Sequence, residues 1–448
     1  MIEQWTGADV RALRDAMRLT QEEFAAVCNR GVRTIGKWEQ QGETALLSPR
    51  SADVMDTLLD GLRPEQTRRF YGARPSSELS VTAAVPRSGG LHSPLDAELR
   101  AWVEMNRREL LHIFGGVAGG LPAIAAMLAG LDTDERQQFG DVLIRPERIN
   151  DATIGHIEDA FDIALAQNDL YGPHAVLPMV ITQRAIASAV LEQAPDRLKP
   201  RLLTIRSKLA QLAGWMQFDL RDFGAANASY EDARESAHEA GNDALVTLVL
   251  CNLSYLATWR GAPRTGIDHA VAAQNWARSV DDGRLRSYAA AMAAFAYASA
   301  GQQGACLAAL DVADGTLHDI PTEENSVAYF HSPGLLLSFR SDCMYRLGRA
   351  DNAQQAAESS LALIDGSFIR NRALAYVDLA RAHIEAREID GATQAIGSAA
   401  GLAASCRSDR LLSIICEARS GLDPWSGALC VRELDQSLAD YGLFNSRI

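Results

Sequence analysis

Several residue types and motifs are rare or absent in this sequence, and each absence excludes a class of function. Only three lysines, Lys37, Lys199 and Lys208, occur among 43 basic residues, so arginine carries nearly all of the positive charge. The seven cysteines include no CxxC pair and no zinc-ligand spacing, which argues against a zinc finger and predicts reduced, buried thiols. The nine histidines are scattered, and no HExxH, GxSxG or Walker sequence is present. The sequence therefore predicts no catalytic residue, no metal site and no cofactor.

Targeting signals are also scarce. The first 21 residues are charged throughout, so no N-terminal signal peptide is expected. Residues 110–131 carry no formal charge and are long enough to span a bilayer. However, five glycines and Pro122 leave that stretch few large apolar side chains. We expect a buried helical connector there, no membrane contact and a cytoplasmic protein.

The charge is distributed unevenly along the 448 residues. The net charge is −14, yet residues 1–74 hold 11 basic and 11 acidic side chains, so the rest of the chain carries the whole acidic excess. An acidic body does not bind nucleic acid non-specifically. Any contact with DNA must therefore come from a small, locally basic element near the N-terminus.

Composition also divides the chain into parts. Residues 73–94 contain three prolines, five serines and Gly89-Gly90 without regular periodicity, which is typical of a flexible linker. From about residue 97 the chain is helical in pattern, with no convincing strand alternation. We predict an N-terminal domain at 1–72, a linker at 73–96, a helical connector at 97–150 and a repeat domain at 151–448.

Repetition is the strongest feature of the C-terminal part. A turn followed by a helix of small residues recurs at intervals close to 40 residues, with one near 47. A period of this length built from two helices indicates an α-solenoid of tetratricopeptide-like hairpins. The predicted fold is therefore all-α, with an N-terminal helix-turn-helix head, a flexible linker and this solenoid. The turns are Asp222–Ala226, Gly261–Pro263, Gly301–Gln303, Gly348–Ala350 and Arg387–Ile389.

The N-terminal part has the pattern of short helices around a turn. Thr6 is placed to cap a helix whose inner face is Val10, Leu13 and Met17. The next stretch, residues 20–40, reads TQEEFAAVCNRGVRTIGKWEQ. Thr20 and Glu23 have the spacing of a capping box that begins a second helix.

Within residues 20–40, side-chain size sets the expected orientation of two helices. In the second helix, Phe24 and Val27 are expected to face the core, with the small Ala25 at the helix approach. The third helix begins after Gly31, and its Ile35 and Trp38 are expected to face inward. Its outward positions are then Arg33, Gly36 and Lys37.

This register resembles the Xre/lambda-repressor family of helix-turn-helix domains over about 60 residues. The resemblance implies that Gln21 contacts a phosphate and braces the recognition helix, and that the major-groove positions are Val32, Arg33, Gly36 and Lys37. Arg33 could pair with guanine, which is worth about 1–3 kcal/mol of discrimination. Gly36 offers no side chain, so dimer spacing and DNA shape are expected to add specificity. Arg30 is a predicted phosphate contact, as are Arg11, Arg14 and Arg50.

The repeat region also carries a resemblance. Residues 209–243 are similar to the tetratricopeptide region of actinobacterial Xre-type regulators, and residues 105–116 to their connecting segment. The architecture resembles the peptide-pheromone receptors of Gram-positive bacteria. These resemblances imply a repeat domain that dimerises and senses a ligand.

The concave face of the solenoid is the predicted ligand site. Aromatic side chains with a few arginines and asparagines suit an extended peptide or a small apolar molecule. Packing between repeats is the alternative role for each of them, and Trp215 is assigned to the core rather than to the ligand. The candidate ligand contacts are Asn252, Tyr255, Trp259, Tyr288, Phe295, Tyr345, Arg346 and Arg381.

Two functions fit these features. The first is a sequence-specific transcriptional regulator that binds double-stranded DNA as a homodimer and responds to a signalling peptide or small ligand. The alternative is a tetratricopeptide scaffold or adaptor with a vestigial helix-turn-helix. Binding to a preferred DNA sequence distinguishes the two.

Overall fold

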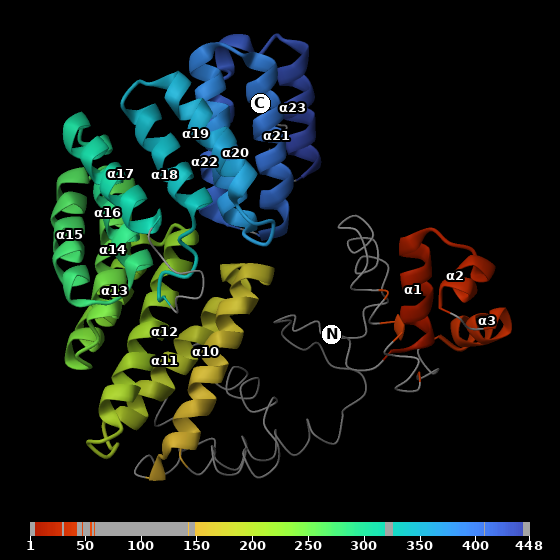
Figure 1. Cartoon of the computed structure of the whole chain (residues 1–448), viewed down its shortest axis with the longest axis horizontal. Coiled ribbons are helices and arrows are strands. Elements are labelled where there is room, and N and C mark those ends of the chain that lie inside the picture. Colours follow the sequence, from red (N-terminus) through yellow and green to blue (C-terminus); the bar gives the residue numbers. More distant parts are fainter. Residues whose placement is uncertain are drawn as a thin grey trace. The chain divides into compact units, whose positions relative to one another are not determined.

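The computed structural model describes residues 5–28, 31–42, 47, 54, 55, 58, 142, 148–318, 326–406 and 408–441. The chain divides into two compact units, residues 1–89 and 90–448. The elements in the described ranges are helices, which confirms the all-α prediction (Figure 1). The predicted linker at 73–96, almost all of the connector at 97–150 and the apolar stretch at 110–131 lie outside the described residues.

The first unit contains the predicted helix-turn-helix. Its helices are α1 (Gly7–Met17), α2 (Gln21–Val27) and α3 (Val32–Gln41). Thr6 caps α1 as predicted: its hydroxyl accepts from the Asp9 amide at 3.2 Å, and the Asp9 carboxylate accepts from the Thr6 amide at 2.9 Å. This reciprocal cap fixes where α1 begins.

The core of the first unit follows the predicted apolar spacing with one exception. Val10, Leu13, Phe24 and Ile35 are fully buried, and Met17 and Trp38 pack against them. The prediction that Val27 faces the core is wrong, because its side chain is 48% exposed. The inner face of α2 is set by Phe24, Ala25 and Cys28, and that face turns Val27 toward solvent.

An ion pair ties the three helices of the first unit together. The Arg14 guanidinium donates to both oxygens of Glu39, at 2.6 and 3.2 Å, and to the Leu19 carbonyl at 2.9 Å. Gln21 donates to Glu39 at 2.7 Å. Arg14 is thus a bracing residue, because its hydrogen bonds face the protein, and its predicted role as a phosphate contact is not supported.

The second unit is a succession of antiparallel helical hairpins (Figure 1). In each hairpin a first helix packs against the helix that follows it, and the first helices of successive hairpins also touch. The helices are α10 (Asp151–Tyr171), α11 (Pro173–Leu191), α12 (Lys199–Asp219), α13 (Phe223–Glu239), α14 (Asp243–Trp259), α15 (Pro263–Trp276), α16 (Gly283–Ser299), α17 (Gln303–His318), α18 (Pro333–Arg346), α19 (Ala350–Leu363), α20 (Ile369–Ala386), α21 (Ile389–Cys406), α22 (Asp409–Ser420) and α23 (Leu429–Asp440).

The five predicted turns lie where the second helix begins in five of the hairpins, at α13, α15, α17, α19 and α21. In each, a residue with positive φ lies two positions before the helix. This left-handed conformation reverses the chain after the first helix. Three of the turns use glycine, which adopts it without steric cost, and two use arginine. The residues are Arg221, Gly261, Gly301, Gly348 and Arg387.

Serine hydroxyls join the two helices of several hairpins. Ser254 donates to the Gly266 carbonyl at 2.7 Å, and Ser341 donates to the Ala353 carbonyl at 2.7 Å. A Cβ at Gly266 would lie 2.0 Å from the Thr258 hydroxyl, so only glycine permits this approach. Ser254 and Gly266 therefore allow the two helices of this hairpin to pack closely.

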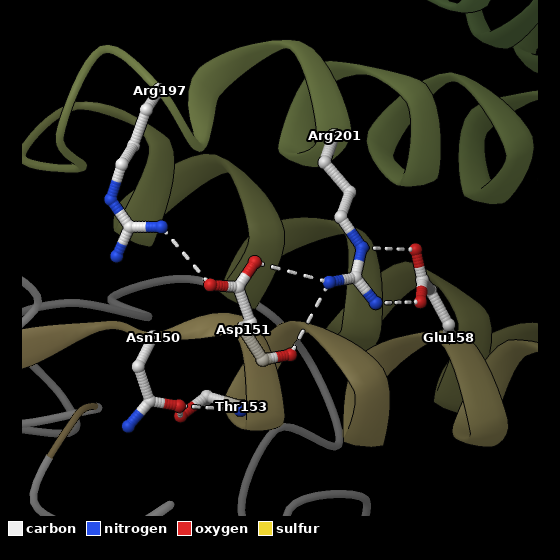
Figure 2. Close-up of polar contacts among 6 residues, drawn as sticks. All are labelled: Asn150, Asp151, Thr153, Glu158, Arg197 and Arg201. Atoms are coloured by element: carbon white, nitrogen blue, oxygen red, sulfur yellow. Dashed lines mark hydrogen bonds and ion pairs between the residues drawn. The ribbon is translucent and has the colours of Figure 1, made fainter.

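The first hairpin is fastened to the second by a charged network, shown in Figure 2. Arg201 of α12 binds Glu158 of α10 with both arms of its guanidinium, at 2.9 and 2.5 Å. Arg197 pairs with Asp151 at 3.0 Å. Asn150 accepts from the Thr153 amide at 2.9 Å and caps α10. This network fixes the start of α10 against α12.

Helix α11 has a membrane-like composition within the repeat unit. In the described part of the chain it alone is long and apolar enough to cross a bilayer by length and composition. It contains Pro178, and it packs against α10 and α12. Val180, Ile186 and Val190 are fully buried in the core that it shares with these helices.

The arc of hairpins closes on itself within the repeat unit. Helix α10 contacts α21, and α12 contacts α22. Arg370 of α20 donates to the Asn168 carbonyl of α10, and Arg410 of α22 donates to Asp219 of α12 at 3.1 Å. The sequence pattern did not predict this closure, which joins residues about 200 positions apart.

Candidate ligand cavity and DNA-binding helix

A cavity of about 750 Å³ lies inside the arc of hairpins. Its walls come from α10, α12, α14, α16, α18, α20 and α22, with the turn residues 326–330 and 367–368. These helices include the first helix of each hairpin, which is the concave face expected of a solenoid. Cavities of about 300–1,000 Å³ accommodate small molecules and short peptides.

Helical periodicity explains which side chains reach the cavity. On α14 the lining residues are Leu245, Leu248, Asn252, Tyr255 and Trp259, spaced by three or four positions. This spacing keeps them on one stripe of the helix. The same spacing selects Leu335, Ser338, Asp342 and Arg346 on α18, and Leu374, Asp378 and Arg381 on α20.

Aromatic rings form one continuous wall. Trp215 stacks on Tyr255 at 6.4 Å between ring centroids, and Tyr255 contacts Phe295 at 5.2 Å. Phe339 meets both Tyr255 and Tyr288, at 6.2 and 6.3 Å. Trp215, which the sequence assigns to the core, thus lines the cavity. This wall offers ring faces and edges to an apolar ligand.

Four charged side chains on α18 and α20 form what we call the Asp378 cluster: Asp342, Arg346, Asp378 and Arg381. Arg346 donates to Asp342 at 2.8 Å, and Arg381 lies 3.7 Å from Asp342 and 3.8 Å from Asp378. Burial, together with the neighbouring Asp342 carboxylate, raises the pKa of Asp378 to about 7. Two arginines face two carboxyl groups, so the Asp378 cluster has matched numbers of acidic and basic groups.

A second charged group, the Asp219 cluster, consists of Asp219, Arg370 and Arg410. Arg410 donates to Asp219 at 3.1 Å, and both side chains are almost fully buried. Arg370 lies 3.6 Å from the second Asp219 oxygen. The Arg410 guanidinium also lies 4.8 Å from the Phe218 ring and 5.5 Å from the Trp215 ring. Arg370 and Arg410 both line the cavity.

The structure brings most of the predicted ligand contacts together. Seven of the eight line the cavity, whereas Tyr345 does not, and its ring lies 5.8 Å from the Arg381 guanidinium. Sequence reasoning missed the Asp219 cluster, Asp342, Asp378 and the turn at residues 326–330. Helical spacing on α18 and α20 could have found Asp342 and Asp378, whereas the turn residues carry no sequence signal.

One lining residue has an unused hydrogen-bond donor. Asn252 is 3% exposed, and its Nδ2 has no hydrogen-bond partner among the described residues. A buried donor without a partner costs about 1–3 kcal/mol relative to a paired one. An acceptor supplied by a ligand would satisfy it.

A buried histidine supports the turn that borders the cavity. His331 is fully buried, and its Nε2 lies 3.0 Å from the Ser287 hydroxyl, which itself donates to the Ala313 carbonyl at 2.8 Å. In the part of the chain that the structure describes, Nδ1 has no hydrogen-bond partner, and Nε2 is the nitrogen placed to donate to the Ser287 oxygen. Burial and the nearby Arg284 lower the pKa of His331 to about 3.

His331 predicts an acid-sensitive fold. Below pH 6.5 the unfolded chain binds a proton at this histidine that the folded chain does not, so stability is lost as pH falls from 6.5 toward 3. Between pH 7 and pH 5 the wild type should lose about 2 kcal/mol more than His331→Gln. Urea unfolding of both proteins across this range measures the difference, and parallel pH profiles would contradict it.

In the first unit, the described side chains of the predicted DNA-binding set lie in and beside α3. Val32 is 42% exposed, Lys37 is exposed, and Gly36 lies beside Gln21, whose amide is held by Glu39. A Cβ at Gly36 would lie 3.4 Å from the Gln21 side-chain oxygen. Arg30 and the Arg33 side chain lie outside the described residues. Their roles remain predictions.

Metal chemistry has no candidate site in the part of the chain that the structure describes, where no three His, Cys, Asp or Glu side chains form a metal-binding group.

No protein-family model matches this chain, and no curated protein matches it. Among solved structures, it is similar to the crystal structure of a Rap protein in complex with competence and sporulation factor. The two chains are 15% identical, with a TM-score of 0.43, over 71% of this chain and 87% of the other. At this identity and TM-score, the match says nothing about what the cavity of this chain binds.

Proposed function

We propose that this protein is a DNA-binding transcriptional regulator whose repeat domain receives a signal ligand. The observation that carries the ligand half of the proposal is the cavity of about 750 Å³, with its aromatic wall and buried polar groups. Such a combination of apolar surface and a few convergent polar groups is typical of ligand sites. A peptide or a small apolar molecule is the proposed ligand, and no catalytic step is assigned.

The DNA half of the proposal rests on the first unit. Arg14, Gln21 and Glu39 brace α3 against α1 and α2, while Lys37 and Val32 stay exposed on α3. A rigidly held helix with an exposed lysine suits insertion into the major groove. Because direct readout by this helix is limited, we propose that the protein acts as a homodimer on two half-sites.

Closure of the arc provides a route from ligand to response. The cavity is lined by α10 and α12 at one end of the arc and by α20 and α22 at the other. A ligand that contacts both ends binds the closed arc better than an opened one, and it therefore shifts the balance between them. A ligand can change DNA binding only if its affinity differs between two states of the protein, here the closed and the opened arc.

The proposed DNA binding can be tested with a sequence that the protein itself selects from a random pool of DNA. The variant Arg33→Ala with Lys37→Ala is expected to lose about 100-fold in affinity for the selected sequence, because two base or phosphate contacts are removed. Gel shifts at several salt concentrations measure this loss. Arg264→Ala with Lys199→Ala removes the same two residue types from the repeat unit and should leave affinity unchanged.

Two results would overturn the DNA half of the proposal. The wild type could show no preference for any sequence, or the double variant in α3 could bind as tightly as the wild type. Either result would favour the scaffold function, in which the repeat domain binds another protein.

A further inference from the structure

The charged side chains around the cavity are balanced in number. Several of them are poorly screened by water, since those of Asp219, Arg410, Asp342 and Arg381 are at most 16% exposed. A ligand with a net charge would leave that charge unmatched in these surroundings, so the balance favours an uncharged ligand. Among the described residues, and with Asp219 counted because Arg410 binds it, the acidic set is Asp162, Asp219, Asp342, Asp378 and Glu417, and the basic set is Lys208, Arg346, Arg370, Arg381 and Arg410.

The cavity wall also has buried polar atoms without a hydrogen-bond partner among the described residues. Two of them donate: Nδ2 of Asn252 on α14 and Nη1 of Arg410 on α22. Oδ1 of Asp342 on α18 accepts, and Arg381 lies 3.7 Å from it, beyond hydrogen-bond reach. A buried polar atom without a partner costs free energy that a ligand can recover by pairing with it. The ligand should therefore supply both acceptors and a donor.

An aromatic contact lies between two of these atoms. Asn252 is one helical turn before Tyr255 on α14, and Asp342 is one turn after Phe339 on α18, so each pair shares a helix face. The rings of Tyr255 and Phe339 meet at 6.2 Å between their centroids. An apolar group on these rings has Asn252 and Asp342 as its polar neighbours. One of them needs an acceptor and the other a donor.

We propose that the ligand of this cavity is an uncharged amide, a peptide-like molecule whose ends are blocked or joined, with its apolar part on Tyr255 and Phe339. An amide carbonyl accepts from Asn252, and an amide N–H donates to Asp342. This inference rests on the proposed ligand-receptor function and names its ligand class. Amide groups supply both the acceptor and the donor without a charge, whereas a free amino or carboxyl end adds one.

A matched series of dipeptide derivatives tests the charge of the ligand. N-acetyl-Leu-Phe-amide is uncharged, N-acetyl-Leu-Phe carries a carboxylate, and Leu-Phe-amide carries an ammonium group. The uncharged fluorescent probe N-phenyl-1-naphthylamine reports on occupation of the cavity in the full-length protein. The uncharged derivative should displace this probe at about tenfold lower concentration than either charged one. Fluorescence titration measures the three concentrations.

Replacing one unused donor locates the site. Asn252→Leu removes Nδ2 and should weaken binding of N-acetyl-Leu-Phe-amide about tenfold, after correction for the affinity of each protein for the probe. Its midpoint of urea unfolding should be no lower than that of the wild type, because the donor it removes is buried and unpaired. Thr258→Val is the matched control: the Thr258 hydroxyl is also buried on α14 with no hydrogen-bond partner in the described ranges, but it does not line the cavity.

Each outcome supports or overturns the inference. Displacement by a charged derivative at the same or a lower concentration overturns it, and so does an Asn252→Leu variant that binds N-acetyl-Leu-Phe-amide as tightly as the wild type. A loss after Thr258→Val as large as after Asn252→Leu also overturns it. If the probe binds but no derivative displaces it, the amide class is overturned while the cavity remains a ligand site. If neither the probe nor any derivative binds, the ligand half of the proposed function is overturned as well.

Discussion

Replacing Asp219 by alanine is expected to lower the free energy of unfolding of the repeat domain by about 3–5 kcal/mol. The substitution leaves Arg410 and Arg370 facing each other in a site from which water is excluded. Arg410 then loses the carboxylate to which it donates, and its buried positive charge cannot regain its hydration without opening the structure. Because Arg410 and Arg370 lie near the other end of the arc, the expected damage is loss of its closure.

Urea unfolding followed by circular dichroism measures this loss. The double variant Asp219→Ala with Arg410→Met should recover part of it, since the buried charge that lost its carboxylate is then absent. Asp435→Ala is the matched control: Asp435 also pairs with a largely buried arginine, but that residue, Arg419, keeps Asp423 at 2.9 Å. A loss after Asp219→Ala no larger than after Asp435→Ala would show that closure does not depend on the Asp219 cluster.

Replacing Gly7 by alanine is expected to destabilise the first unit by about 3 kcal/mol or more and to remove DNA binding. A Cβ at Gly7 would lie 1.9 Å from the Trp38 carbonyl oxygen and 2.9 Å from that of Gly42. Both are backbone atoms, so α1 must separate from α3. A domain of this size has only about 3–5 kcal/mol of stability to lose.

Scanning calorimetry and a gel shift on the same protein test this prediction. The transition of the first unit should disappear or move well down in temperature, while binding of N-phenyl-1-naphthylamine to the repeat domain stays as in the wild type. Gly31→Ser is the matched control, because Gly31 is an exposed N-cap of α3 without a side-chain hydrogen bond, and serine is at least as good there. Wild-type stability and DNA affinity in Gly7→Ala would contradict the prediction.

The helical hairpins were predictable because their signals are local. A glycine or arginine two residues before the second helix, as at Gly301 and Arg387, changes chain direction through its own backbone conformation. The cap at Thr6 and the apolar spacing of Val10 and Leu13 likewise act within a few residues. Val27 was misassigned because Phe24, Ala25 and the adjoining Cys28 face the core, and this orientation turns Val27 toward solvent.

The cavity was predictable in part. The aromatic stripe on α14, with Tyr255 and Trp259, follows from helical spacing, and the structure places it in the cavity wall. Trp215 was assigned to the core because its neighbour Gly214 suggested tight packing, and a Cβ at Gly214 would indeed lie 2.6 Å from the Tyr230 ring. Helix α12 packs tightly on the side of Gly214 and lines the cavity on the side of Trp215. A sequence pattern alone does not distinguish these two sides.

The sequence by itself determined where five second helices begin and which stripe of α14 faces the cavity, because these depend on neighbours within one or two turns. The tertiary structure alone decided that the arc closes and that Arg410 meets Asp219 across 191 residues. The free energy of a buried charge depends on the groups around it in space. For that reason, the sequence did not show which charged groups meet at the cavity wall.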